Sequence, residues 1–144
     1  MGKSRKQDPE SISARLDWKQ FEELTEKAFA LFGFETFKNF RMTRPRMEVD
    51  LLAMRNELAF AVDCKHWKRT VGRGAMLRIG DRQILRSKRL LGHRGLSRVV
   101  PVILTWHDEL LGVLDNGVPI VPIHRLTDFV MNWESASQIL VLSP

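Results

Sequence analysis

Residues 47–65 read MEVDLLAMRNELAFAVDCK, and this stretch decides the fold. Two apolar runs, 47–54 and 58–65, flank a short polar Arg-Asn-Glu tip, a pattern that predicts an antiparallel hairpin. The first run contains Asp50 and the second contains Asp63. Counted inward from the asparagine of the tip, these acids are six and seven positions away. The hairpin therefore predicts that they lie side by side.

The second strand of this hairpin separates polar from apolar side chains. Asp63 and Lys65 are two residues apart, so they point to the same face of the strand. Ala59 and Ala61 share that face and leave it uncrowded, whereas the other face is core: Leu58, Phe60, Val62 and Cys64. A charged pair at the end of an apolar strand is costly unless it is paired or functional. Taken alone, Asp63 and Lys65 also fit an ordinary surface ion pair.

The acids of the hairpin indicate a metal site. Adjacent carboxylates repel each other unless a proton or a cation lies between them, and Mg²⁺ is the usual cation beside phosphates, with Mn²⁺ as a substitute. Asp50 and Asp63 would hold the metal, and the backbone carbonyl of Cys64 would add a ligand. Lys65 would position or activate the attacking water, or stabilise negative charge on a phosphoryl group.

A third carboxylate comes from the preceding segment, where the pattern predicts a helix that begins at Asp17 and ends at Gly33. Asp17 and Gln20 form a capping-box pattern, and apolar residues recur at three- and four-residue spacing. Glu22 lies on the border of this apolar stripe, whereas Glu23 points away from it. Glu22 is therefore the helix acid that we expect to support the metal shell or orient a water.

The remaining chain predicts further helices and strands around the hairpin. We expect an alternating strand over 34–42, a basic helix that begins at Gly72 and ends near Gly92 or Gly95, and a buried strand over 98–106. An edge strand over 118–123, which contains Pro119 and Pro122, and a helix over 126–133 follow. The apolar residues 139–142 fit an edge strand or a subunit contact. The order predicts an α/β fold with a central mixed sheet flanked by helices. Residues 1–13 read as a flexible basic tail, and 14–144 as one domain.

Charge is unevenly distributed along the 144 residues. The net charge is +6, but residues 65–98 contain eleven basic side chains and one acid, which makes +10, while the remainder sums to −4. A basic segment on an acidic body favours a polyanion partner, with DNA the first candidate. In this segment Arg73, Arg78, Arg82, Arg86 and Arg89 mostly recur at helical spacing. The residues that we expect to contact DNA are Arg44, Arg46, Trp67, Lys68, Arg69, Arg73, Arg78 and Arg82.

Several classes of protein are excluded or disfavoured. One cysteine, Cys64, permits no intrachain disulfide, which favours a reducing and cytoplasmic setting. No apolar run approaches the length of a membrane span, and the polar start of the chain lacks the apolar centre of a signal peptide. The histidines show no zinc spacing.

The set Glu22, Asp50 and Asp63-Cys64-Lys65, on a helix and two strands, resembles the PD-(D/E)XK nuclease superfamily. Within it, the chain is similar to Mrr-like restriction endonucleases and archaeal Holliday junction resolvases from about Trp18 to Trp106. The resemblance implies a restriction-endonuclease-like αβββαβ core and Mg²⁺-dependent DNA cleavage. It implies catalytic roles for Asp50, Asp63 and Lys65, with Glu22 assisting, and a possible homodimer that cuts two strands.

The chain departs from the family pattern at two places. Val49 replaces the proline that names the motif, and the basic segment 41–46 stands where Mrr-like proteins often have a glycine-rich loop. An alternative function is therefore a catalytically inactive nuclease-fold module that binds DNA or assembles partners. A further alternative, from charge alone, is a binder of other polyanions or of anionic lipid.

Overall fold

The structure, a computed structural model, describes residues 9–65, 71–106 and 112–144, with side chains described from Asp17 onward. Its main elements are α1 (Pro9–Ala30), β1 (Glu35–Met42), β2 (Met47–Arg55), β3 (Leu58–Lys65), α2 (Arg73–Leu90), β4 (Arg98–Thr105), β5 (Gly112–Val113), β6 (Pro119–Pro122) and α3 (Leu126–Asn132). Three short 3₁₀ turns cover His93–Gly95, Ile123–Arg125 and Trp133–Ser135.

The strands form one mixed sheet in the order β1-β2-β3-β4-β6-β5. β1, β2 and β3 pair antiparallel, as the hairpin pattern predicted. β3, β4 and β6 run parallel, and α2 makes the crossover between β3 and β4. The predicted α/β class with a mixed central sheet is confirmed.

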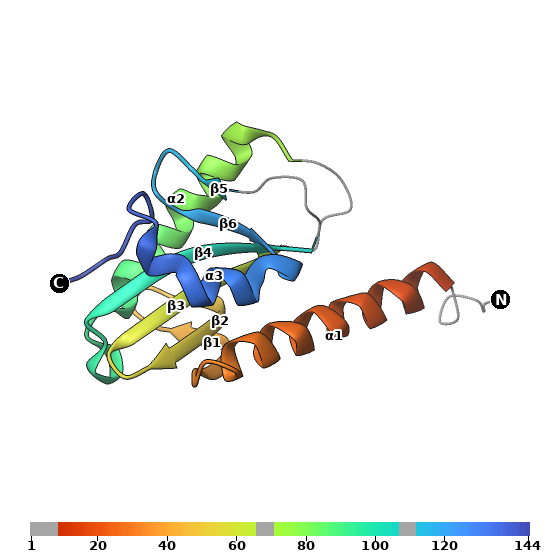
Figure 1. The fold of residues 1–144 in the computed structure, drawn as a ribbon, viewed down its shortest axis with the longest axis horizontal. Helices are drawn as coiled ribbons and strands as arrows, with labels where there is room; N and C mark the ends of the chain where they lie inside the picture. The colour runs from red at the N-terminus through yellow and green to blue at the C-terminus, as the bar shows by residue number, and fades with distance from the viewer. Residues whose placement is uncertain (1–8, 66–70, 107–111) are drawn as a thin grey trace.

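Helices cover both faces of the sheet (Figure 1). α1 and α3 pack on one face, where Phe60 of β3 meets aromatic rings from these helices and from the residues that directly follow them. The centroid distances are 5.4–5.8 Å to Phe29, Phe34, Phe129 and Trp133. α2 packs on the other face against Ala59, Ala61 and neighbouring apolar residues. In the described ranges, no helix is both long and apolar enough to cross a membrane.

The first helix begins eight residues earlier than the sequence predicted. It starts at Pro9 rather than at Asp17, so residues 9–13, which we assigned to a flexible tail, are helical. Proline is favoured in the first turn of a helix, where its missing N–H has no partner to lose. The capping-box pattern at Asp17 therefore lies inside a continuous helix, and the local signal was misleading.

The edge of the sheet beyond β4 also differs from the prediction. We expected an edge strand over 118–123, but β6 lies between β4 and the two-residue strand β5. Pro119 and Pro122 are the first and last residues of β6, where a missing N–H interrupts the ladder least. β5 is too short to show an alternating pattern. At the far end of β4, beyond the pairs with β6, Leu142 and Val99 exchange two backbone hydrogen bonds of 2.9 and 3.0 Å, so the C-terminal segment forms a single bridge.

Candidate active site

Strands β2 and β3 separate where the two acids meet. Their ladder is regular from Arg55–Leu58 to Leu51–Val62 and ends there, one position before Asp50 and Asp63 would pair. Instead, the backbone N–H of Cys64 donates a hydrogen bond to Oδ2 of Asp50 at 2.9 Å. The carboxylate of Asp50 thus takes the acceptor position that a neighbouring strand would otherwise fill, and it lies beside Asp63.

On the other side of β2, the pairing with β1 is also irregular at Asp50. The β1–β2 ladder pairs Lys38 with Leu51 and Phe40 with Val49, but it omits Asn39, which would face Asp50. Asn39 has a φ of 53°, in the left-handed region that asparagine tolerates better than most residues. This turn in the backbone lets Phe37 and Phe40, three residues apart, pack against the same apolar cluster. The predicted alternation over 34–42 is therefore broken at Asn39, beside the candidate site.

Asp63 is a buried acid with an abnormal pKa. Its relative exposure is 5%, and burial, followed by a hydrogen bond with the Asp50 carboxyl, raises its pKa to about 7. The positive charges of Lys65 and Arg86 act in the opposite direction. Such a hydrogen bond between two carboxyl groups requires a proton, and Asp63, with its raised pKa, retains one more readily than an ordinary aspartate. A divalent cation would take the place of that proton.

Lys65 lies directly beside this pair of acids. Its Nζ is 3.5 Å from Oδ1 of Asp63, and its side chain is 29% exposed. The two residues occupy the same face of β3, as their spacing predicted, whereas Leu58, Phe60 and Val62 face the α1 side. The lysine can therefore reach a bound phosphate while it contacts the buried acid.

Cys64 contributes its backbone rather than its thiol. Burial, together with the nearby charge of Asp50, raises the pKa of the thiol far above its ordinary value, and the side chain packs against the α1-side core. The N–H and C=O of one strand residue point the same way. Because the N–H of Cys64 points to Asp50, its carbonyl faces the same gap between β2 and β3.

The donors at this gap fit a hard divalent cation. Two carboxylates and a backbone carbonyl are the oxygen ligands that Mg²⁺ accepts, with water and phosphate oxygens completing its shell. Among the described residues, no three His, Cys, Asp or Glu side chains gather closely enough to hold a metal ion. The structure therefore does not bring Glu22 together with Asp50 and Asp63 as a third side-chain ligand, because Glu22 extends from α1, across the opposite face of the sheet.

Glu22 nevertheless borders a cavity of about 340 Å³ that Asp50 also lines. This cavity lies between α1 and strands β1 to β3, and its wall includes Trp18, Asn39 and Cys64. Glu22 is half-buried and Glu23 is exposed, so the helix presents the acid that its apolar stripe indicated. From this position Glu22 can orient a water molecule beside Asp50.

A second cavity of about 500 Å³ reaches Asp50 from the α2 side. It is lined by Arg46, Arg82, Arg86, Asp50, Glu48, Met47 and Leu85. Two of the arginines expected to contact DNA, Arg46 and Arg82, thus lie beside the acids. The sequence placed Arg86 in the arginine row but did not show that it lines the same cavity as Asp50.

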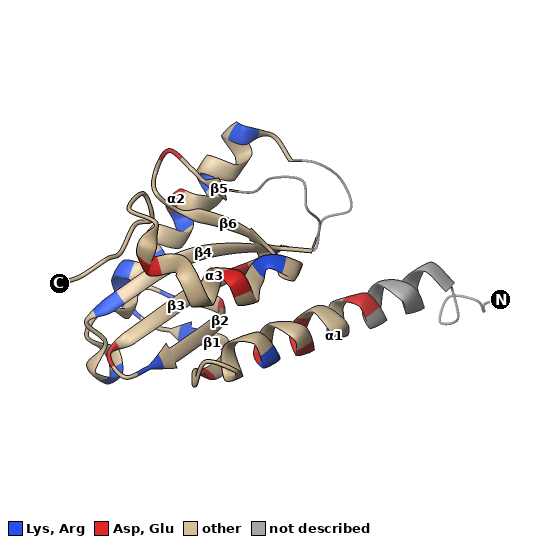
Figure 2. Cartoon of the chain, in the orientation of Figure 1, with Lys and Arg blue, Asp and Glu red and all other residues tan. Residues whose placement is uncertain are grey.

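Lys and Arg residues occur on several elements of the chain and are not confined to α2 (Figure 2). Arg44 is exposed in the turn between β1 and β2, and Arg78 is exposed on α2. Arg73, at the start of α2, forms an exposed ion pair with Asp115 at 3.2 Å, well outside the arginine-lined cavity. Trp67, Lys68 and Arg69 lie outside the described residues.

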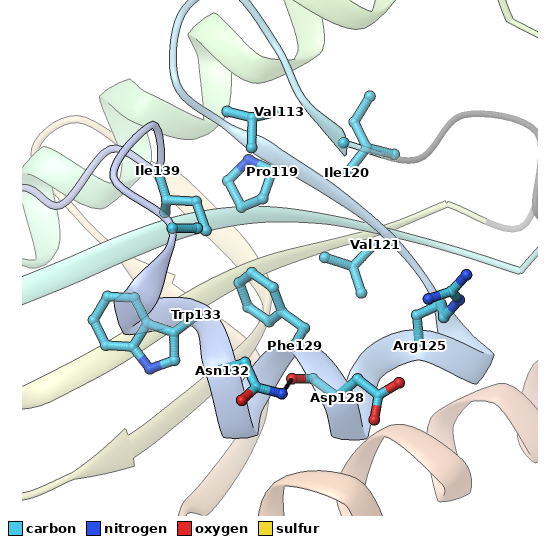
Figure 3. A pocket seen from close by; sticks show the side chains of 12 residues that line it. Val113, Pro119, Ile120, Val121, Arg125, Asp128, Phe129, Asn132, Trp133 and Ile139 are labelled. Atoms are coloured by element: carbon cyan, nitrogen blue, oxygen red, sulfur yellow. Dashed lines mark hydrogen bonds between the residues drawn. The ribbon is translucent and has the colours of Figure 1, made fainter.

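The most apolar cavity of the described residues lies elsewhere, between β6 and α3 (Figure 3). Its volume is about 290 Å³, and Phe129 and Trp133 form much of its wall. The polar groups around it are Arg125, Asp128 and Asn132, and the Asn132 amide already donates to the Asp128 carbonyl at 3.1 Å. It holds no pair of acids, so the chemistry points to the Asp50 side of the sheet.

Residues 13–82 match the Mrr_cat family, described as restriction endonuclease. The match covers most of α1, strands β1 to β3 and the first half of α2, and so includes the acids and the lysine above. A crystal structure of a protein of unknown function, AF1548, is similar over 59% of this chain and 46% of its own, with 21% identity and a TM-score of 0.42. None of the curated proteins matches the chain.

Proposed function

We propose that this chain, whose residues 13–82 carry a restriction-endonuclease domain of the PD-(D/E)XK nuclease superfamily, is a metal-dependent DNA endonuclease. One observation supports an active site: β2 and β3 separate at Asp50, and the gap brings Asp50, Asp63 and Lys65 together. A hydrogen-bonded pair of acids with a lysine 3.5 Å away has no evident role in stabilising the fold, since burial of Asp63 is itself costly.

Each residue of the gap has a distinct role in this proposal. Asp50, Asp63 and the carbonyl of Cys64 would hold Mg²⁺, or Mn²⁺ in its place, which would polarise the phosphoryl group and lower the pKa of a bound water. Lys65 would donate to a phosphate oxygen and stabilise the charge that develops on it. Asp63 would keep the Lys65 ammonium in position through their contact.

DNA is the proposed substrate because the charge distribution matches a polyanion. The segment 65–98, with a net charge of +10, begins at Lys65 and continues through α2 to the start of β4. Arg46 and Arg82 line the cavity that opens onto Asp50. A phosphate backbone bound there would cross the carboxylate pair.

A cleavage assay tests this function. Supercoiled, linear and four-way-junction DNA would be incubated with the protein in Mg²⁺, Mn²⁺, Ca²⁺ or EDTA. We expect nicking or cutting in Mg²⁺ or Mn²⁺ and at least 100-fold less product with Asp63→Ala and with Lys65→Ala. Asp128→Asn, on the exposed side of α3, is a matched control that we expect to cleave normally.

The assay also separates the alternative of an inactive DNA-binding module. Such a module would bind DNA in a salt-dependent manner without product in any metal. Cleavage that persists in both the Asp63→Ala and Lys65→Ala proteins would refute the proposed site, and binding to anionic vesicles in preference to DNA would refute the proposed substrate.

A further inference from the structure

The cavity between β2 and α2 contains more positive charge than the carboxylates beside it can neutralise. Three guanidinium groups, of Arg46, Arg82 and Arg86, line it together with two acids, Glu48 and Asp50. Glu48 is also drawn toward Arg41, 3.9 Å away, and Asp50 accepts the N–H of Cys64. Neither acid forms an ion pair with these three arginines in the described structure, so the cavity suits an anion.

Arg86 is held in this cavity by a buried amide. Gln83, one turn earlier on α2, is 1% exposed, and its Nε2 donates to the Ala61 carbonyl at 2.7 Å. This bond fixes the amide so that its Oε1 accepts a hydrogen bond from Nη1 of Arg86 at 3.0 Å. One of five guanidinium N–H groups is used in this way, and the planar group retains donors for a bidentate ligand.

The other wall of the cavity is also fixed to α2. Nη2 of Arg89 donates to the carbonyl of Thr43 at 2.9 Å, which ties the turn between β1 and β2 to the helix. Arg46, in the same turn, is thereby placed across the cavity from Arg82. Arg86 is close enough to Asp63 for its charge to act on that carboxyl. An anion bound by these arginines would therefore lie next to the carboxylate pair.

We propose that this cavity binds one internal phosphate of the DNA backbone and that Arg86 donates two hydrogen bonds to it, holding the strand against Asp50 and Asp63. The inference rests on the proposed nuclease function and deepens it, because it assigns a phosphate-binding role to a residue outside the acid-lysine motif. Arg82 and Arg46 add charge at the mouth of the cavity, whereas Arg86 contacts the phosphate at its inner end.

Binding without metal tests the contact independently of cleavage. The probe is a closed dumbbell duplex of about 30 base pairs, which has no terminal phosphate, and its dissociation constant would be measured in EDTA over a range of NaCl concentrations. One lost phosphate contact lowers the slope of log Kd against log [NaCl] by about 0.9. We expect this decrease in Arg86→Ala and not in Lys27→Ala, which removes the same charge from an exposed position of α1, outside the cavity and outside the basic segment 65–98.

Cleavage kinetics add a readout that a purely structural role would not move. We expect Arg86→Ala to reduce kcat by about 100-fold with an unchanged melting temperature, and Arg86→Lys to restore the salt slope but not kcat, because an ammonium group lacks the planar fork. Equal salt slopes in Arg86→Ala and Lys27→Ala would overturn the inference while wild-type cleavage still supported the proposed function. Tighter binding of a linear 5′-phosphorylated duplex than of the dumbbell would also overturn it, in favour of a terminal phosphate. Wild-type protein that neither binds nor cuts DNA would instead refute the function itself.

Discussion

Replacing Asp63 with asparagine is expected to stabilise the metal-free protein at pH 8, although it removes an acid of the proposed active site. Burial and the hydrogen bond with Asp50 raise the pKa of Asp63 to about 7, from an ordinary value of 3.8. Between these values the folded protein retains a proton that the unfolded chain has lost. The free energy of unfolding therefore falls as the pH rises through this window, and the loss is complete above about pH 7.

The size of the effect follows from the same two pKa values. A difference of about three pKa units corresponds to about 4 kcal/mol, of which roughly a third is already lost at pH 5. Asparagine carries no titrating proton, and its amide can donate to the Asp50 carboxylate in place of the shared proton. The stability of Asp63→Asn relative to wild type should thus increase by about 2–3 kcal/mol between pH 5 and pH 8.

Urea unfolding in EDTA at both pH values measures this difference. The control is Asp128→Asn, an exposed acid for which we expect the same stability difference at pH 5 and pH 8. Mg²⁺ added at pH 8 should stabilise the wild type more than Asp63→Asn, since only the wild type retains both carboxylates. A stability difference between Asp63→Asn and wild type that does not change between pH 5 and pH 8 would refute the reasoning.

Two further substitutions test the geometry around the site. Asn39→Val should lower the free energy of unfolding by about 1–3 kcal/mol, because a β-branched residue is strained at a φ of 53°. Asn39→Gly should change it by less than about 0.5 kcal/mol. Equal losses for the two variants in urea unfolding would contradict this reasoning. Gly80→Ala should destabilise the protein by about 1–2 kcal/mol, although alanine is the better helix former, because its Cβ would lie 2.8 Å from Nδ2 of Asn116. Asn116 cannot move freely, since its amide donates to Asp81 and accepts the N–H of Val118. An increase in melting temperature for Gly80→Ala would show that the added methyl group does not clash with Asn116.

The sequence predicted the elements that depend on local patterns. The bounds of β3 agree with the predicted run 58–65, and the hairpin places Asp50 next to Asp63 as counted from its tip. The two-residue spacing of Asp63 and Lys65 indicated their contact. These predictions held because alternation in a strand and the length of a turn depend on residues close together in the chain.

Local patterns gave wrong or incomplete predictions where a longer stretch of sequence or a tertiary contact decided the structure. The capping box at Asp17 lies inside a helix that starts at Pro9, because a capping pattern does not end a helix that good helix formers can extend. Gln83 reads as a polar residue on a basic helix, yet it is almost fully buried by its bond to Ala61, 22 residues earlier. No periodicity in the sequence distinguishes such a glutamine from an exposed one.

By itself, the sequence identified the residues that we propose carry the chemistry: two acids and a lysine on adjacent strands, followed by a basic helix. Only the tertiary structure decided how they meet. β2 and β3 separate at Asp50, and Glu22 borders a cavity on the α1 side that Asp50 also lines. On the α2 side, Arg86 lines a cavity with Asp50, whereas Arg73 pairs with Asp115. The physical reason is that these positions result from the packing of α1 and α2 on opposite faces of the sheet. This packing brings together residues that are far apart in the chain, so their local spacing carries no signal of it.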